Sequence, residues 1–193
     1  MPASSSLFRT TALAALVALG ATAAHAQSSV SVYGLIDLSV GQSQAPGAKA
    51  TKNVNSGNMS TSFIGFKGSE DLGGGLNAVF AIESFMRNDT AAAGRFDGDT
   101  FWARSAYVGL SSGAGTVTLG RNTTSLFVNT LLFNAFGDSF GFSPAIRQTF
   151  TSSAPFPTAP TRANDVQVSG DTGWSDSVKY ASPNFGGLSF TAH

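Results

Sequence analysis

Apolar and polar side chains alternate along two segments that meet at a glycine-rich turn, residues 70–75. Successive side chains of a β-strand point to opposite faces, so this alternation predicts a hairpin of two strands within residues 63–86. One face of the hairpin carries the charged residues Lys67 and Glu83. The other face is apolar and carries Ile64, Phe66, Phe80 and Ile82.

The same alternation predicts further strands along the chain. Long polar segments at 42–60 and 87–100 indicate loops, whereas shorter connections rich in glycine indicate tight turns. Outside the hairpin, strands are expected at residues 30–41, 101–111, 116–121, 177–182 and 188–192. The pattern therefore predicts seven strands whose connections alternate between long and short.

The facing of the apolar side decides between two all-β architectures. A soluble sandwich turns it inward, whereas a transmembrane barrel turns it toward lipid and keeps the charges in a wet lumen. Residues 30–41 have the length of a tilted membrane strand, and alternating long and short connections are typical of such barrels. We therefore expect an antiparallel transmembrane β-barrel. The residues expected to face lipid or a neighbouring subunit are Ile36, Phe66, Phe80 and Ile82.

The segment 101–111 departs from clean alternation. Arg104 falls on the same parity as the apolar residues Ala106 and Val108. Either a β-bulge or a face that packs on another subunit would explain this mixture, and the sequence leaves both open.

Residues 122–174 form a segment without a convincing strand that is far longer than an ordinary loop. Seven phenylalanines lie within it, which indicates that part of it packs against something. A short helix is expected at 125–133 and irregular chain at the proline-rich residues 152–160. The segment is either a loop that folds into the barrel and narrows the channel or a surface flap, and a barrel fold favours the former.

Residues 1–26 have the features of a secretory signal peptide. Arg9 precedes an apolar run at 12–19, and the segment ends in Ala24-His25-Ala26, a small-x-small cleavage pattern. The run is shorter than the ~20 residues of a membrane-spanning helix. We therefore predict export and cleavage after Ala26, and any membrane crossing by the remaining chain would use strands.

The composition narrows the function classes. The chain has 11 basic and 11 acidic residues, and this balance gives no argument for nucleic-acid binding. It has no cysteine, and of its two histidines one lies in the predicted signal peptide. Disulfides and thiolate metal sites are thus excluded, and no nucleophile–base pair or metal cluster stands out. We expect no enzymatic activity, no cofactor and no metal.

Five motifs carry a resemblance to a known family. They are VYGLID at 32–37, GFKGSEDLGGGL at 65–76, AYVGL at 106–110, GTVTLGR at 115–121 and SVKYASPNFGGLSF at 177–190. In this order they resemble general porins of the outer membrane of Gram-negative bacteria, of the beta-proteobacterial type. The resemblance implies a sixteen-stranded, usually trimeric barrel in outer-membrane lipid whose third extracellular loop folds into the lumen. Residues 27–193 would be the N-terminal part of that barrel, and 122–174 would contain the constriction loop.

The function implied is a passive diffusion channel for small hydrophilic solutes and ions. Two departures from the family qualify it. Phe63 occupies a position where the family usually has arginine, and the family's chains are longer than this one. The sequence is therefore expected to be a truncated product or a partial sequence. The alternatives are a non-conducting outer-membrane barrel or adhesin, or a truncated porin without function; conductance in a planar bilayer separates a channel from the others.

Seven charged residues are candidates for the pore lining. Parity places Asp37, Lys67, Glu83 and Lys179 toward the lumen. The resemblance adds Arg104 and Arg121 as basic wall residues, and Asp138 is the candidate acid on the constriction loop. Fixed charges of this kind set the ion preference of a pore, and the slight basic excess predicts a weak preference for anions. Each could instead be a solvated residue without a role in selectivity.

Overall fold

The computed structural model describes residues 29–44, 47–150 and 171–193. Its main element is an antiparallel sheet, to which the short strand β6 (Ala92–Ala93) is added by pairing with one end of β5 (Leu76–Arg87). The remaining strands, in the order in which they pair, are β1 (Ser29–Leu35), β4 (Phe63–Gly73), β5 (Leu76–Arg87), β7 (Ser105–Ser112), β8 (Gly115–Thr123), β9 (Gly173–Ala181) and β10 (Thr191–Ala192). Apart from the separate hairpin below, each strand follows its neighbour in sequence, so the sheet is an up-and-down meander.

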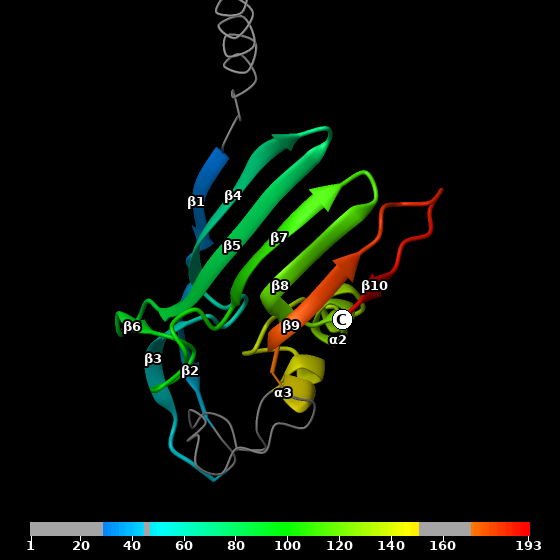
Figure 1. Cartoon of the computed structure of the whole chain (residues 1–193). Helices are drawn as coiled ribbons and strands as arrows, with labels where there is room; N and C mark the ends of the chain where they lie inside the picture. Colours follow the sequence, from blue (N-terminus) through cyan, green and yellow to red (C-terminus); the bar gives the residue numbers. More distant parts are fainter. Residues whose placement is uncertain (1–28, 45–46, 151–170) are drawn as a thin grey trace, which may run out of the picture.

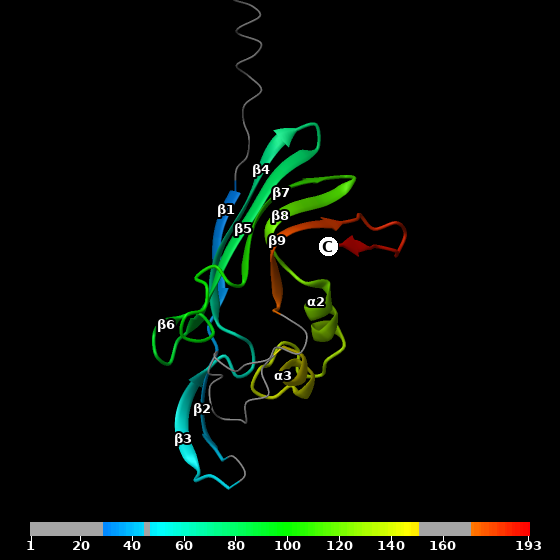
Figure 2. The same ribbon diagram turned by 60° about the horizontal axis from the view of Figure 1, so that its bottom comes forward.

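A separate hairpin and two helices lie in the long connections. The hairpin consists of β2 (Leu38–Ser43) and β3 (Thr51–Ser56), and the helices are α2 (Ser125–Leu132) and α3 (Pro144–Phe150). Figure 1 shows tight turns at one end of the sheet, which we name the short-turn end, and all the long connections at the opposite, long-loop end. In Figure 2 the sheet curves, and both helices lie on its concave side.

The register of the β4–β5 hairpin confirms the predicted parity. Phe66 lies opposite Ile82, and Gly68 lies opposite Phe80. A Cβ atom at Gly68 would clash with the ring of Phe80, so the missing side chain leaves room for the ring to lie across the neighbouring strand. The predicted all-β, antiparallel fold is thus confirmed.

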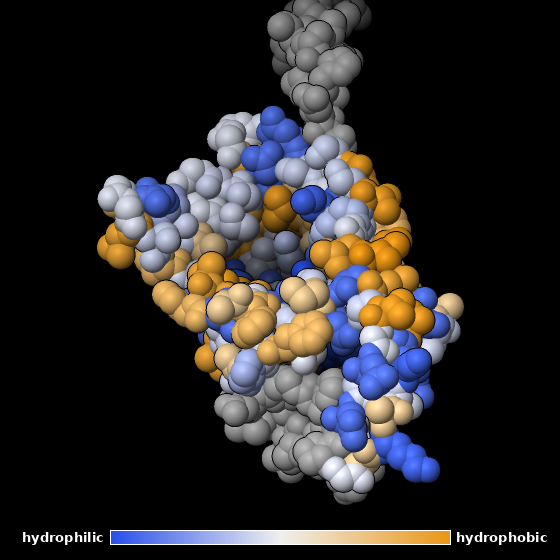
Figure 3. Space-filling model, turned by 180° about the vertical axis from the view of Figure 1, so that it is seen from behind, coloured by the Kyte–Doolittle hydropathy of each residue, from blue (hydrophilic) through white to orange (hydrophobic). Residues whose placement is uncertain are grey.

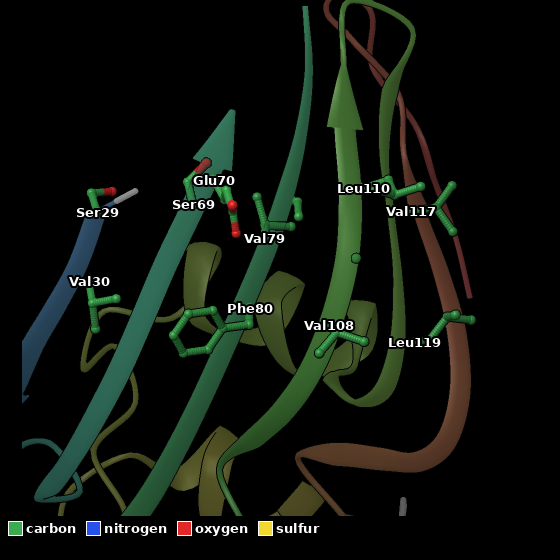
Figure 4. A pocket seen from close by; sticks show the side chains of 12 residues that line it. Ser29, Val30, Ser69, Glu70, Val79, Phe80, Val108, Leu110, Val117 and Leu119 are labelled. Atoms are coloured by element: carbon green, nitrogen blue, oxygen red, sulfur yellow. The ribbon is translucent and has the colours of Figure 1, made fainter. Parts of the chain in front are cut away.

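The convex face of the sheet is apolar and exposed. The register aligns Phe80, Val108, Leu119 and Val178 in one row across four strands. Val108 is 61% exposed and Val178 is 60% exposed. Figure 4 shows Phe80, Val108 and Leu119 on this face, together with Val30, where they line a shallow depression, while the helices lie behind the sheet. A contiguous apolar face of this kind is expected of a surface that meets lipid or another subunit.

The opposite face is largely polar. Among the described residues only five apolar side chains are buried: Ala81, Phe85, Ala103, Ile146 and Phe150. Buried hydroxyl and amide side chains are more numerous and include Ser62, Ser84, Ser105, Thr118 and Asn122. The sheet therefore has the inside-out arrangement of a membrane barrel rather than the apolar interior of a sandwich.

Four predicted boundaries were wrong, one of them at the expected strand 177–182, which is β9 and begins at Gly173 within the segment 122–174 that was expected to hold no strand. The expected strand 30–41 is two strands, because the chain leaves the sheet at Ile36 and Asp37 and enters the β2–β3 hairpin. The expected loop 42–60 contains β3, and the expected strand 101–111 begins only at Ser105.

Other expectations have mixed outcomes. The helix expected at 125–133 is confirmed as α2, whose N-cap Thr124 accepts a hydrogen bond from the backbone of Phe127. Of the expected strand 188–192 only β10 pairs with β9. The predicted signal peptide at 1–26 and the irregular chain at 152–160 lie outside the described residues. Within the described ranges, none of the helices has the length and apolarity needed to span a membrane.

Candidate functional site

The concave face carries the charged side chains that alternate with the apolar row. The register places four residues side by side across four strands: Tyr33, Gly65, Glu83 and Ser105. Lys67 lies on the same face, two residues further along β4 toward the short-turn end. Figure 3 looks at the molecule from this side and shows a hollow between the sheet and the long connections, with hydrophilic residues inside it and both hydrophilic and hydrophobic residues on its rim.

Tyr33, Glu83 and Arg104 form a hydrogen-bonded chain on this face. The hydroxyl of Tyr33 donates to Oε1 of Glu83 over 2.5 Å, and Nη1 of Arg104 donates to Oε2 over 2.9 Å. Gly65 makes the arrangement possible, because a Cβ atom there would lie 2.9 Å from Cγ of Glu83 and 3.2 Å from the ring of Tyr33. Both carboxylate oxygens of Glu83 therefore have partners in a buried position.

Arg104 precedes β7, and this explains the mixed parity of the segment 101–111. Since the strand begins at Ser105, Arg104 lies outside it, and its side chain need not point to the same face as Ala106 and Val108. It reaches the concave face, where it pairs with Glu83. Its guanidinium carbon lies 3.9 Å from the ring centroid of Phe63. Phe63 thus stacks on a neighbouring arginine, an arrangement that favours the cation.

Lys67 is the exposed cation of this group. Its Nζ lies 4.7 Å from the centroid of the Tyr33 ring, and the residue is exposed. No described carboxylate forms an ion pair with it, in contrast to Arg104. Lys67 therefore presents a positive charge to the hollow.

Arg121 belongs to a different group, which we name the arginine–aspartate cluster: Arg95, Asp99, Arg121 and Asp171. Arg95 pairs with Asp99 over 2.9 Å and with Asp171 over 2.8 Å, and Arg121 pairs with Asp171 over 2.6 Å. Arg121 also donates to the backbone oxygens of Ala103 and Gly173. The cluster thus ties the β5–β7 connection to the end of β8 and to the start of β9.

The ion pairs of this cluster shift the pKa values of its members. Burial raises the pKa of Asp171, but hydrogen bonds and charge from Arg95 and Arg121 outweigh it and lower the pKa to about 2. Burial likewise acts to raise the pKa of Asp99, and the contacts with Arg95 outweigh it and lower that pKa. For Arg95 burial acts to lower the pKa, but its two carboxylates raise it. All three residues lie outside the strands of the sheet.

Asp37 and Asp138 lie at the long-loop end and take part in one network. Oδ2 of Asp37 accepts the backbone N–H groups of Met59 and Ser60. The hydroxyl of Ser60 donates to Oδ2 of Asp138 over 2.7 Å. Asp37 lies in the break between β1 and β2, where strand parity does not apply, so its place in the pore lining stays a prediction.

The seven candidate residues therefore fall into separate places. Glu83 and Arg104 meet directly, Lys67 contacts the Tyr33 ring beside them, and Asp37 and Asp138 share the Met59–Ser60 segment. Arg121 lies in the arginine–aspartate cluster, and Nζ of Lys179 donates to the backbone oxygen of Thr123 over 2.9 Å. In the part of the chain that the structure describes, no three His, Asp or Glu side chains gather as metal ligands would.

Sequence reasoning missed Arg95, Asp99, Asp171 and Tyr33. The spacing of Arg95 and Asp99, four residues apart, is the one local signal of a pair. Asp171 is 76 residues from Arg95 and 50 from Arg121, and nothing in the sequence indicates that these residues meet. Tyr33 lies within the motif at 32–37, and its partner on the concave face follows only from the register.

The comparisons with known proteins agree with this arrangement. A family model described as Gram-negative porin matches residues 12–193. Outer membrane porin protein 32 of Delftia acidovorans is 33% identical over 183 residues, which are 92% of this chain and 46% of that protein. An outer membrane porin protein of Bordetella pertussis is 34% identical over 148 residues, which are 69% of this chain and 38% of that protein.

A solved structure shows the same fold. The anion-selective porin from Comamonas acidovorans matches with a TM-score of 0.63 and 24% identity, over 85% of this chain and 45% of that one. The chain thus spans less than half the length of the relatives that it matches. From its motifs, its inside-out sheet and these matches, the chain belongs to the Gram-negative porin family.

Proposed function

We propose that the chain forms part of the wall of a water-filled diffusion channel for small hydrophilic solutes and ions. The observation that carries this is the two-faced sheet: an exposed apolar row on the convex face, and Lys67, Glu83 and Arg104 on the concave face. Such a sheet buries its apolar face in lipid and lines water with its charges. Passive diffusion through a wet pore needs neither a catalytic residue nor a cofactor.

The segment between β8 and β9 is the proposed constriction. Its helices α2 and α3 lie on the concave side of the sheet, where a channel-narrowing loop would be (Figure 2). Two further parts complete the proposal: a homotrimeric assembly in outer-membrane lipid, which comes from the family, and export with removal of residues 1–26, which comes from the signal-peptide pattern. Mass spectrometry of the protein from outer membranes tests the last point, because cleavage after Ala26 gives a new N-terminus at Gln27.

The proposed pore lining consists of the seven candidate residues, with a weak preference for anions. Lys67, Arg104, Arg121 and Lys179 are the basic members, and Asp37, Glu83 and Asp138 are the acidic ones. Two of the cations have carboxylate partners, since Arg104 pairs with Glu83 and Arg121 pairs with Asp171. Their fields are thus partly cancelled at close range, which makes exposed Lys67 the strongest contributor to the preference.

Reconstitution in planar bilayers tests the function. Folded protein should give discrete conductance steps that grow with salt concentration, and proteoliposomes that contain it should swell in small sugars. A reversal potential in a salt gradient then gives the ion preference. Folded, membrane-inserted protein that gives neither steps nor swelling would contradict the channel and favour a non-conducting barrel or adhesin.

A further inference from the structure

We infer that residues 58–60, which we name the loop platform, position the described part of the segment that follows β8, residues 124–150, and thereby set the width of the channel. This inference rests on the proposed function for its consequence, the channel width. The positioning itself rests on the contacts around Asp37 and Asp138. In these contacts both acids act as positioning residues, a role that is separate from the lining charge proposed above.

Asp37 organises the loop platform. Its Oδ2 accepts the N–H of Met59 over 2.6 Å and the N–H of Ser60 over 2.8 Å. Its backbone oxygen accepts the N–H of Gly57 over 3.0 Å, and its own N–H donates to Oγ of the fully buried Ser62. One carboxylate therefore orients two consecutive N–H groups of the turn that follows β3.

The β8–β9 segment docks on this turn through three hydrogen bonds. The hydroxyl of Ser139 donates to the backbone oxygen of Asn58 over 2.6 Å, and the N–H of Gly141 donates to the same oxygen over 3.1 Å. The hydroxyl of Ser60 donates to Asp138 over 2.7 Å. Ser139 is fully buried, and a Cβ atom at Gly141 would lie 2.8 Å from the oxygen of Asn58. The two backbones thus approach as closely as a glycine permits.

The loop platform also joins the docked segment to the first hairpin. Nδ2 of Asn58 donates to Oγ of Ser39 in β2 over 2.7 Å. Further along the chain, Asp171 holds the approach to β9 between Arg95 and Arg121. The segment is therefore fastened at 138–141 and again at 171, and the first of these fastenings depends on Asp37.

Two substitutions at one position separate positioning from charge. Asp37→Asn removes the negative charge but keeps a carbonyl oxygen that can accept the N–H groups of Met59 and Ser60. Asp37→Ala removes both the charge and the acceptor. A positioning role predicts that the Asn variant resembles the unchanged protein and that the Ala variant differs, whereas a role in ion selection predicts that both variants change alike.

The first readout does not depend on conductance. The chain has no cysteine, so Ser143→Cys introduces a single thiol at a fully buried position of the docked segment that makes none of the three docking bonds. Because losing hydrogen bonds to a charged acceptor changes an equilibrium by roughly tenfold or more, labelling by a membrane-impermeant maleimide should accelerate at least about tenfold with Asp37→Ala. With Asp37→Asn it should change little. Equal labelling rates in all three backgrounds would overturn the inference.

The second readout is the size limit for sugars in proteoliposome swelling. Asp37→Ala and the pair Ser60→Ala with Asp138→Ala should change this limit and increase open-channel noise, while Asp37→Asn should not. Thr130→Ala is the matched control, since it removes a hydroxyl of the same segment whose hydrogen bond, to the backbone oxygen of Leu126, lies within α2. If Asp37→Ala fails to fold, the double variant Ser60→Ala with Asp138→Ala provides the same test.

The outcomes separate the two proposals. An unchanged size limit in conducting channels, together with unchanged labelling, contradicts the positioning role and leaves the channel intact. Labelling that follows the predicted pattern in a protein that does not conduct supports the positioning role and contradicts the channel.

Discussion

Replacing Asp171 with asparagine should destabilise the protein at neutral pH and have little effect in acid. The side chain is 29% exposed and contacts both Arg95 and Arg121. Its pKa falls from the ordinary 3.8 to about 2, a difference that corresponds to about 2.4 kcal/mol of stability at 1.36 kcal/mol per pH unit.

The sign follows from the direction of the shift. A carboxyl whose pKa is depressed by folding contributes its stability above the unfolded pKa and loses it as the pH falls through the folded pKa. The contribution of Asp171 should therefore be complete at pH 6, reduced to about half near pH 3 and nearly absent near pH 1.5. In acid the unchanged protein and Asp171→Asn should converge, because both then carry a neutral side chain.

Urea unfolding in phospholipid vesicles, followed by tryptophan fluorescence, measures the free energies. Asp171→Asn should lower the free energy of unfolding by about 2 kcal/mol at pH 6 and by about 1 kcal/mol at pH 3. Asp176→Asn is the matched control, since Asp176 is exposed in β9 and forms none of the ion pairs of the described structure. A difference that is absent at pH 6, or equal at both pH values, would refute the reasoning.

Three further predictions concern the wall and its loop. Lys67→Gln should shift the reversal potential toward cation preference more than Arg104→Gln does, because Arg104 is already paired; the reverse order would show that the paired charge dominates. Val108→Arg should lower the free energy of unfolding in lipid by about 2–4 kcal/mol, whereas Ser69→Arg on the opposite face should change it little; equal effects would reverse the facing. Thr124→Ala should destabilise α2 by about 1 kcal/mol, seen as faster amide exchange in its first turn, and unchanged exchange would exclude a capping role.

The β4–β5 hairpin was predictable because its pattern is local and strict. Phe66 pairs with Ile82 and Gly68 with Phe80, as the alternation around the glycine turn requires. The faces of β7 and β8 follow from the same rule. Wherever one face of a strand meets lipid and the other meets water, side-chain parity is enough to assign both.

The break at Asp37 was not predictable, because its cause is not local. The alternation runs from Val30 to Val40 without a glycine or proline at the break, since β1 and β2 are both strands. The chain turns out of the sheet where the carboxylate binds Met59 and Ser60, more than twenty residues later. β3 was also missed, because its sequence is largely polar and therefore shows no alternation of apolar and polar residues.

The arginine–aspartate cluster as a whole could not be derived. Its members come from the β5–β7 connection, the end of β8 and the chain before β9, which meet only when the sheet has formed, and a single Asp171 in a polar stretch carries no signature. The pairing of Arg104 with Glu83 was similarly hidden, because parity placed Arg104 on the apolar face as long as its strand was thought to begin at residue 101.

The β2–β3 hairpin makes no strand pairing with the main sheet, and this has a consequence for how the protein can diverge. A change in the length of the hairpin leaves every strand register of the wall as it was, whereas one residue gained or lost in β4 or β5 would turn apolar side chains into the water. The hairpin is thus a segment where surface sequence can vary quickly among strains, or where a foreign peptide can be displayed, as long as Asp37 and residues 58–60 at its base are kept.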